Sequence, residues 1–295
     1  MTTVARARQV FERVRPGRSS LYQRLIDANG ATRVNVNFAL LIAIVLLGLA
    51  APILPLRNPV QPLPLERLQP PSAEHWFGTD TNGMDVFSRT IHAIRTDFTL
   101  AISSVVIGIV IGVPLGAISG YYGGRVDDVI TRITEVFQGF PQILFAMAVL
   151  AAAGNSLVNL ILVIAFYNIP VYSKMVRSVV VPLREVEFVQ AAQVAGNRPA
   201  AIVFRHIIPN ALVPVFSQLP LSCAYAVQMI AGLSFIGLGV SIPTPEWGSM
   251  IQNGASQIVF GKWWVSVFPG LALFLSVWVL NNVSDIFKSL VIRRA

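Results

Sequence analysis

The side chains that most often carry chemistry are sparse in this sequence and match no catalytic motif. The single cysteine, Cys223, has apolar neighbours that suit a packed thiol, and the three histidines lie outside the long apolar runs. Gly261-Lys262 lacks the earlier glycine and the following hydroxyl of a phosphate-binding loop, and no nucleophile-elbow or zinc-protease motif is present. The sequence therefore predicts a protein without catalytic residues, without a metal site and without a cofactor of its own.

The composition indicates a membrane protein. Hydrophobic residues make up 54% of the 295 residues, and charged residues make up 12%, about half the usual share for a soluble domain. A soluble chain of this length has to keep a largely polar surface, so it cannot bury so much apolar area. These figures exclude an ordinary soluble enzyme, a disordered chain and a disulfide-rich secreted domain.

Six runs are apolar enough to cross a bilayer as helices, since about 20 residues at 1.5 Å each span its hydrocarbon core. None of these runs contains Lys, Arg, Asp or Glu. Ion-coupled carriers usually need an ionisable group within the membrane, so we expect a partner subunit to supply the energy for any transport. The predicted fold is an all-α membrane protein with six transmembrane helices, placed at Asn37–Leu56, Phe98–Gly120, Val136–Ala153, Leu157–Tyr172, Ala211–Gly232 and Trp263–Val283.

The distribution of basic residues predicts that both termini lie in the cytoplasm. In that orientation 17 of the 22 Lys and Arg residues fall on the cytoplasmic side. We expect residues 1–36 to form a cytoplasmic segment without a cleavable signal, and residues 37–295 to form the membrane domain, with extracytoplasmic loops at 57–97 and 233–262. The formal charge of +8 then mainly sets orientation and favours anionic lipid, and no nucleic-acid partner is expected.

Small residues follow one another at every fourth position of the second predicted helix. They are Ser104, Gly108, Gly112, Gly116 and Gly120. Such a stripe lets a neighbouring helix approach closely. Two interpretations remain open, namely ordinary helix packing and contact with a helix that moves during transport.

The segment 173–210, between the fourth and fifth runs, is too long for a simple turn. We predict a helix over Leu183–Ala195 at the membrane surface, and a second short helix before the fifth span. The residues that mark the starts and ends of these two helices are Pro182, Gly196, Pro199 and Pro209.

Residues 187–210, EFVQAAQVAGNRPAAIVFRHIIPN, resemble the EAA loop of ABC-importer permeases, which docks on the ATPase subunit and transmits its closure. Gln190 stands where the family has Glu, and Ile208 where it has Leu. The first departure removes a charge but leaves a hydrogen-bonding side chain. The resemblance implies an ATPase-coupling role for Glu187, Gln190, Ala191, Ala192, Gly196, Arg198, Arg205, His206 and Pro209.

Four further segments resemble the C-type membrane subunit of dipeptide, oligopeptide and nickel permeases, in the same order along the chain. They are 75–89 (HWFGTDTNGMDVFSR), 120–128 (GYYGGRVDD), 234–250 (SFIGLGVSIPTPEWGSM) and 268–272 (FPGLA). Met84 stands where the family has Arg, so that charge is missing here. The first segment forms an extracytoplasmic motif of Gly78, Thr79, Asp80, Gly83, Asp85 and Arg89.

This outer region allows two interpretations, a scaffold for the outer face or a contact surface for a substrate-delivery protein. Five prolines between residues 59 and 71 predict an extended stretch ahead of the motif. Pro243, Pro245 and Trp247 predict a rigid loop with an aromatic tip at the membrane interface.

The resemblance implies the type I ABC importer permease fold and an ATP-driven importer of di- or oligopeptides that works by alternating access in the bacterial cytoplasmic (inner) membrane. The implied partners are a homologous B-type permease subunit, two ABC ATPase subunits (or one fused) that bind ATP and Mg²⁺, an extracytoplasmic peptide-binding protein and the lipid bilayer. Candidates for the translocation path are the polar residues of the fifth span, Ser217, Gln218, Ser222 and Gln228. A nickel-chelate permease remains an alternative, as do a stand-alone channel or ion-coupled carrier and a structural anchor.

Overall fold

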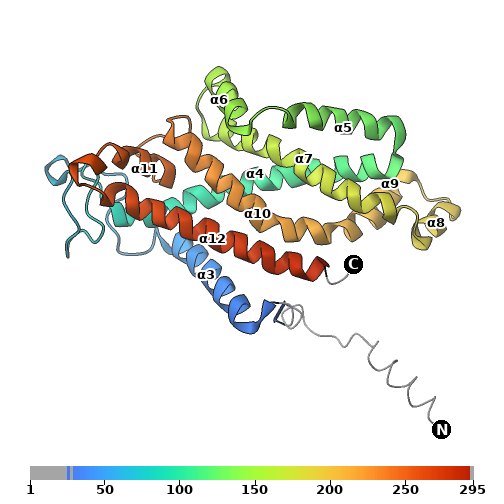
Figure 1. Cartoon of the computed structure of the whole chain (residues 1–295), viewed down its shortest axis with the longest axis horizontal. Coiled ribbons are helices and arrows are strands. Elements are labelled where there is room, and N and C mark those ends of the chain that lie inside the picture. Colours follow the sequence, from blue (N-terminus) through green and yellow to red (C-terminus); the bar gives the residue numbers. More distant parts are fainter. Residues whose placement is uncertain (1–24, 27–28, 293–295) are drawn as a thin grey trace, which may run out of the picture.

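The computed structural model describes residues 25–26 and 29–292, with side chains placed as far as residue 289. In that part of the chain the long helices run side by side, and the β-structure is one isolated bridge between Thr79 and Asp85 (Figure 1). Most of the predicted cytoplasmic segment 1–36 lies outside the described residues. The helices are α3 Ala31–Ala50, α4 Val86–Tyr122, α5 Gly124–Gln138, α6 Gln142–Ala153, α7 Leu157–Leu183, α8 Glu187–Val194, α9 Pro199–Ile202, α10 Ile208–Phe235, α11 Trp247–Ala255 and α12 Trp264–Ile292.

Five helical segments are long and apolar enough to cross a membrane, and the bent pair α5–α6 makes a sixth if it is taken as one span. A five-residue π-helix, Val203–Ile207, joins α9 to α10, so Pro199–Phe235 forms one continuous helical segment. Short 3-10 turns lie at Pro64–Glu66 and Ile258–Phe260. The all-helical membrane fold is confirmed, and the corrections concern where helices begin, end and bend.

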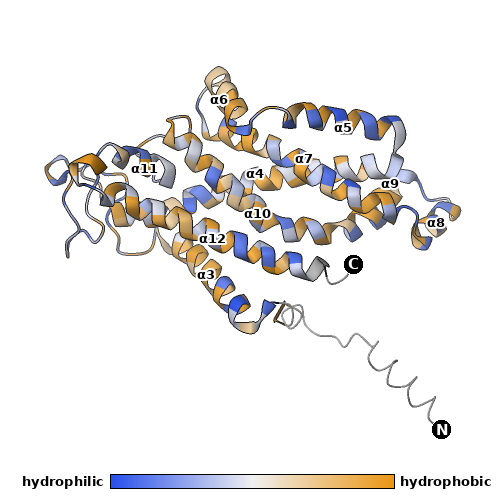
Figure 2. Cartoon of the chain, viewed as in Figure 1, coloured by the Kyte–Doolittle hydropathy of each residue, from blue (hydrophilic) through white to orange (hydrophobic). Residues whose placement is uncertain are grey.

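The third predicted span, Val136–Ala153, is wrong as a single straight helix. α5 ends at Gln138, and α6 begins at Gln142 after a bend of 85°. Pro141 causes the break, because proline lacks an N–H and disfavours helical backbone in the residue before it. The α5 half carries many hydrophilic residues and packs along α4 and α7 (Figure 2).

The predicted end at Ala153 and start at Leu157 are confirmed. Several other predicted ends are wrong because a polar residue ends an apolar run without ending a helix. α3 begins at Ala31 and α4 at Val86, well before the apolar runs that predicted them. α7 continues through Pro182, so the next helix starts at Glu187. The proline at 209 lies in the first turn of α10, directly after the π-helix, and it does not separate two helices.

The small-residue stripe of α4 is a packing surface against α7, as predicted. α4 and α7 form the most extensive helix pair in the described chain. A Cβ added at Gly112 would lie 2.6 Å from the carbonyl oxygen of Ile169, and one at Gly116 would overlap the Ser173 carbonyl. Glycine is therefore required for the observed approach of the two backbones. Movement of α7 along the stripe stays a prediction.

The bundle has two ends that differ in construction (Figure 1). The start of α3, the end of α12 and α8 lie toward one end, here called the α8 end. Residues 51–85 and α11 lie toward the other, here called the α11 end. Asn29 Nδ2 donates to Ser289 Oγ at 2.7 Å, which ties the residues just before α3 to the end of α12. This arrangement matches the predicted order of crossings.

Candidate functional site

The predicted extracytoplasmic motif folds into one buried network at the α11 end. Asp80 Oδ1 accepts the N–H groups of Asn82 at 2.8 Å and Met84 at 3.0 Å, which closes a tight loop. Asp85 is the N-cap of α4, where its Oδ1 accepts the Ser88 N–H at 2.7 Å. An acceptor at this position satisfies one of the free donors at the helix start and fixes the direction in which α4 leaves the loop.

Arg89 is the centre of this network and is only 1% exposed. Its Nη1 donates to the carbonyl oxygens of Pro59 at 2.6 Å and Pro243 at 2.9 Å. Its Nε lies 3.6 Å from Asp80 Oδ2, and its Nη1 lies 3.0 Å from the sulfur of Met84. One side chain therefore ties α4 to two loops that are far apart in the sequence.

Two glycines of the motif have left-handed backbone, with φ of 71° at Gly78 and 80° at Gly83. A Cβ at Gly83 would overlap the backbone carbonyl of Leu63. Thr79 Oγ1 donates to the Glu66 carbonyl and accepts the N–H of Gln69. The motif thus holds the proline-rich stretch against the start of α4.

Sequence reasoning missed the acidic groups that fix α11. Glu246 accepts the N–H groups of Gly248 at 2.7 Å and Ser249 at 2.6 Å, so it caps α11. Asp97 Oδ2 accepts the Trp247 N–H at 3.3 Å. The predicted aromatic tip is wrong, since Trp247 is fully buried. The cap itself could have been recognised, because an acidic residue directly before a helix start is a capping signal.

Burial controls the titration of two loop acids at this end. It raises the pKa of Asp80, and Arg89 and three backbone N–H groups oppose that rise. It also raises the pKa of Glu246, against the N–H groups of Ser249 and Gly248. The described residues contain no group of three or more His, Cys, Asp or Glu placed to hold a metal ion.

The α8 end places the predicted coupling residues up to Arg198 on a short helix and the turn after it, whereas Arg205 and His206 lie in the π-helix and Pro209 lies in α10. Gly196 has φ of 78°, and its N–H donates to the Gln193 carbonyl at 2.9 Å. The N–H of Asn197 donates to the Ala192 carbonyl at 3.1 Å. These two bonds form a Schellman motif, so the predicted role of Gly196 at the helix end is confirmed.

Most of α8 faces away from the bundle. Val189 and Ala192 are the buried residues of this helix, whereas Phe188 is 41% exposed and Val194 is 90% exposed. Gln190 Nε2 donates to the Glu185 carbonyl at 3.0 Å. The other predicted coupling residues are exposed except His206, which is half-buried; the exposed ones are Glu187, Ala191, Gly196, Arg198, Arg205 and Pro209.

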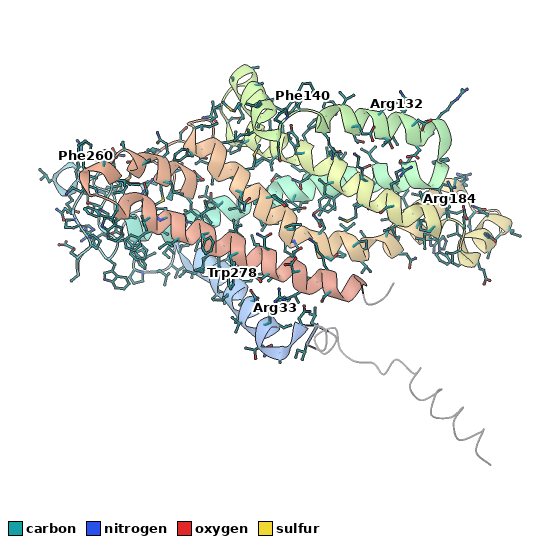
Figure 3. All side chains as sticks on the ribbon, in the orientation of Figure 1. Arg33, Arg132, Phe140, Arg184, Phe260 and Trp278 are labelled. Atoms are coloured by element: carbon teal, nitrogen blue, oxygen red, sulfur yellow. The ribbon has the colours of Figure 1, made fainter. Side chains whose placement is uncertain are left out.

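Two arginines at this end have no ion-pair partner among the described residues. Arg198 and Arg205 form no ion pair with any described residue, and Phe204 between them is 55% exposed. Arg184, labelled in Figure 3, lies beside α8 with its Nη2 at 3.6 Å from Glu185. The surface therefore combines free guanidinium groups with exposed apolar side chains.

An ion pair that sequence reasoning missed fastens α5 to α7. Arg177 donates from Nε and Nη2 to the two carboxylate oxygens of Asp127, each at 2.5 Å. Ser119 Oγ also donates to Asp127 Oδ1 at 2.5 Å. Asp127 was visible only as part of a motif, because its partner is 50 residues away in the sequence.

The four path candidates on α10 do not share one environment. Gln218 and Ser222 line a cavity between α5, α6, α7 and α10. Ser217 is buried and donates to the Pro214 carbonyl at 2.8 Å. Gln228 is exposed and lies outside the cavity.

Known membrane transport proteins are similar in sequence to most of this chain. Residues 112–295 match the family model described as "Binding-protein-dependent transport system inner membrane component". The dipeptide transport system permease protein DppC of Alkalihalophilus pseudofirmus is 38% identical over 85% of this chain and 82% of that protein. The probable D,D-dipeptide transport system permease protein DdpC of Escherichia coli is 39% identical, over 76% of this chain and 75% of its own length.

Two further likenesses extend the comparison. The glutathione transport system permease protein GsiD of Pectobacterium atrosepticum is 36% identical, over 73% of this chain and 71% of its own length. A solved structure of the MetNI methionine ABC transporter in an inward-facing conformation has a TM-score of 0.54 at 17% identity, over 68% of this chain and 96% of that one. At this identity the structural likeness concerns the fold alone.

Proposed function

Because the chain belongs to the family of inner-membrane components of binding-protein-dependent transport systems, and is thus a multi-pass permease subunit of an ABC importer, we propose that its cargo is a di- or oligopeptide. The observation that carries this proposal is the match, over 85% of the chain, to a permease named for dipeptide transport. Relatives named for D,D-dipeptide and peptide transport support the same class of substrate.

The α8 end is the proposed docking surface for the ATPase subunits. Exposed Phe188 and Val194 suit an apolar groove, and the unpaired Arg198 and Arg205 suit acidic groups at its rim. ATP and Mg²⁺ bind to those partners, either two subunits or one fused chain, and this chain performs no chemistry. The α8 end and both termini then face the cytoplasm.

Closure of the ATPases is transmitted through α8 to the membrane helices. The Schellman turn at Gly196 leads into Pro199–Phe235, which is one continuous helical segment. A displacement of α8 therefore moves α10 along the cavity that it lines, and a homologous B-type subunit forms the other wall of the path. The α11 end receives cargo from an extracytoplasmic binding protein.

Uptake by the complete complex in proteoliposomes tests the substrate. We expect the complex to take up labelled tripeptide in an ATP-dependent manner and not to take up labelled nickel chelate. Nickel uptake without peptide uptake would identify the nickel-chelate alternative. Uptake by the membrane subunits without the ATPases would identify a channel or an ion-coupled carrier.

A single bulky substitution tests the coupling surface. A Cβ at Gly196 would meet nothing within 4 Å, so Gly196→Trp places its bulk on the exposed docking face. We expect an assembled complex in which peptide uptake per ATP hydrolysed falls at least tenfold. Gly154→Trp is the control, because it has the same left-handed backbone and open surroundings in the α6–α7 hairpin. Equal coupling in the two variants would refute this docking surface.

A further inference from the structure

The bend between α5 and α6 opens one side of a cavity of about 450 Å³. α7 and α10 form its other walls, and Phe140, labelled in Figure 3, lies at the corner where α5 gives way to α6. The volume falls within the range of about 300–1,000 Å³ that is usual for small-molecule sites. The cavity lies at this bend, where the end of α5 and the start of α6 line it. A straight third helix would not form this wall.

The cavity is lined by neutral amide side chains and aromatic rings. The amides are Gln138, Gln142, Asn168 and Gln218, and the rings are Phe140, Tyr167 and Tyr225. None of its lining residues is charged, although Lys174 lies close enough to donate to Gln138 Oε1 at 2.6 Å. The lining is therefore rich in hydrogen-bonding groups and poor in charge.

Several of these amide groups are free to bind something else. The side-chain amides of Gln142 and Gln218 make no hydrogen bond to any described residue. Asn168 is buried and donates only to the carbonyl of Ile164 at 3.0 Å, which leaves its own oxygen available. Unsatisfied polar groups in a membrane protein favour a polar occupant over lipid.

We propose that this cavity is a transit site that binds the backbone amide groups of a peptide in passage; this inference rests on the proposed function. A primary amide side chain carries both a donor and an acceptor, so it pairs with a peptide group in either orientation. Such pairing ignores the peptide's side chains, which suits a path used by many sequences. Because no lining residue is charged, the charged peptide termini form no ion pair in the cavity. The cargo is therefore bound weakly enough to dissociate and move on.

Backbone N-methylation probes this chemistry directly, because it removes the N–H donor of a peptide and leaves its charges unchanged. The complete complex in proteoliposomes, with its binding protein, is given labelled trialanine or trialanine methylated at its central amide nitrogen. Gln218→Leu removes both hydrogen-bonding groups at a half-buried cavity position. Asn282→Leu on α12 is the matched control, because that amide lies outside the cavity and donates to its own helix at Trp278.

In Gln218→Leu we expect trialanine uptake to fall about fivefold, the worth of one hydrogen bond. We expect uptake of the methylated peptide to fall less, so that preference for the unmethylated peptide shrinks, while Asn282→Leu keeps the wild-type values. The binding protein is the same in every arm, so a change in preference belongs to the membrane subunits.

Three results would overturn or redirect the inference. Wild-type uptake of trialanine together with unchanged uptake and preference in Gln218→Leu would refute the transit site and leave the peptide importer intact. Absence of trialanine uptake by the wild type would instead refute the proposed function. If Gln218→Leu fails to assemble, Gln142→Leu at an exposed cavity position gives the same comparison, and a wild-type result there refutes the site.

Discussion

At the α11 end Arg89 is 1% exposed and donates to carbonyls of two loops, whereas at the α8 end Arg198 and Arg205 are exposed and pair with no described acid. The same contrast holds for apolar side chains, since Trp247 is fully buried and Val194 is 90% exposed. The α11 end binds these charged and aromatic side chains within the chain. The α8 end leaves charged and apolar side chains exposed and without a partner among the described residues.

The α11 end is built to keep a fixed conformation, whereas the α8 end is built to move with a partner. A loop network in which most buried donors and acceptors are paired within the chain resists local opening, because each opening breaks those bonds. A short helix with two buried residues has few contacts to lose and can shift with a partner.

Arg89→Met is expected to have the largest effect on stability. It removes the cation from buried Asp80 and leaves the carbonyls of Pro59 and Pro243 without their donor. Breaking a buried charge pair on one side costs about 3–5 kcal/mol. The melting temperature of the purified complex in detergent measures the loss. Arg67→Met, at an exposed position of the same region, should change the unfolding free energy by less than about 0.5 kcal/mol.

Gly83→Ala and Gly196→Ala compare the same backbone strain at the two ends. Their φ angles are 80° and 78°, so each alanine pays about 1–2 kcal/mol for left-handed backbone. At Gly83 the added methyl group also overlaps the Leu63 carbonyl, which adds about 1–3 kcal/mol, whereas at Gly196 it meets open space. Denaturant melts of both variants give the difference. Equal losses would show that the two turns are equally packed.

Sequence patterns predicted these two ends unequally well, for a physical reason. Gly196 could be placed at a helix end because a left-handed cap depends on neighbouring residues only. The burial of Trp247 could not be predicted, because it depends on a carbonyl of Thr90, which lies 157 residues earlier. Hydropathy located the five long apolar helices, since that depends on composition along the chain, and its sixth crossing corresponds to the bent pair α5–α6 if that pair is one span.

The cavity also lay beyond what the sequence alone could show. A hydropathy run does not record a bend, so Val136–Ala153 looked like one helix although Pro141 breaks it. Without that bend, nothing distinguished Gln218, which lines the cavity, from Gln228, which is exposed outside it. Residue type suggested a path on α10, and only the packing of α5, α6 and α7 selected among its polar groups.

The pH dependence of stability is expected to come from the α11 end. Burial raises the pKa of Glu246 above its ordinary value of 4.5, so the folded state holds this proton more tightly than the unfolded state does. The stabilisation from protonated Glu246 is fully present below the pKa that this group has in the unfolded state. It is lost as the pH rises through the pKa of the folded state. Glu246→Gln stays neutral and keeps one acceptor for α11. Its melting temperature should therefore decline less between pH 5 and pH 8 than that of the wild type, and an unchanged decline would assign the effect elsewhere.

Glu185→Gln should have the smallest effect, although it also removes one partner of an ion pair. Arg184 Nη2 lies 3.6 Å from Glu185 Oε1, and the two side chains are 34% and 72% exposed. Water and salt screen such a pair, so its loss costs less than about 0.5 kcal/mol. Melting at low and high salt measures it, with Arg89→Met as the reference for a buried pair. A loss above about 1 kcal/mol that disappears at high salt would mean that charge fixes the α8 end in place. The Arg184–Glu185 ion pair would then fix α8 in position. The contrast between a fixed α11 end and a movable α8 end would be refuted.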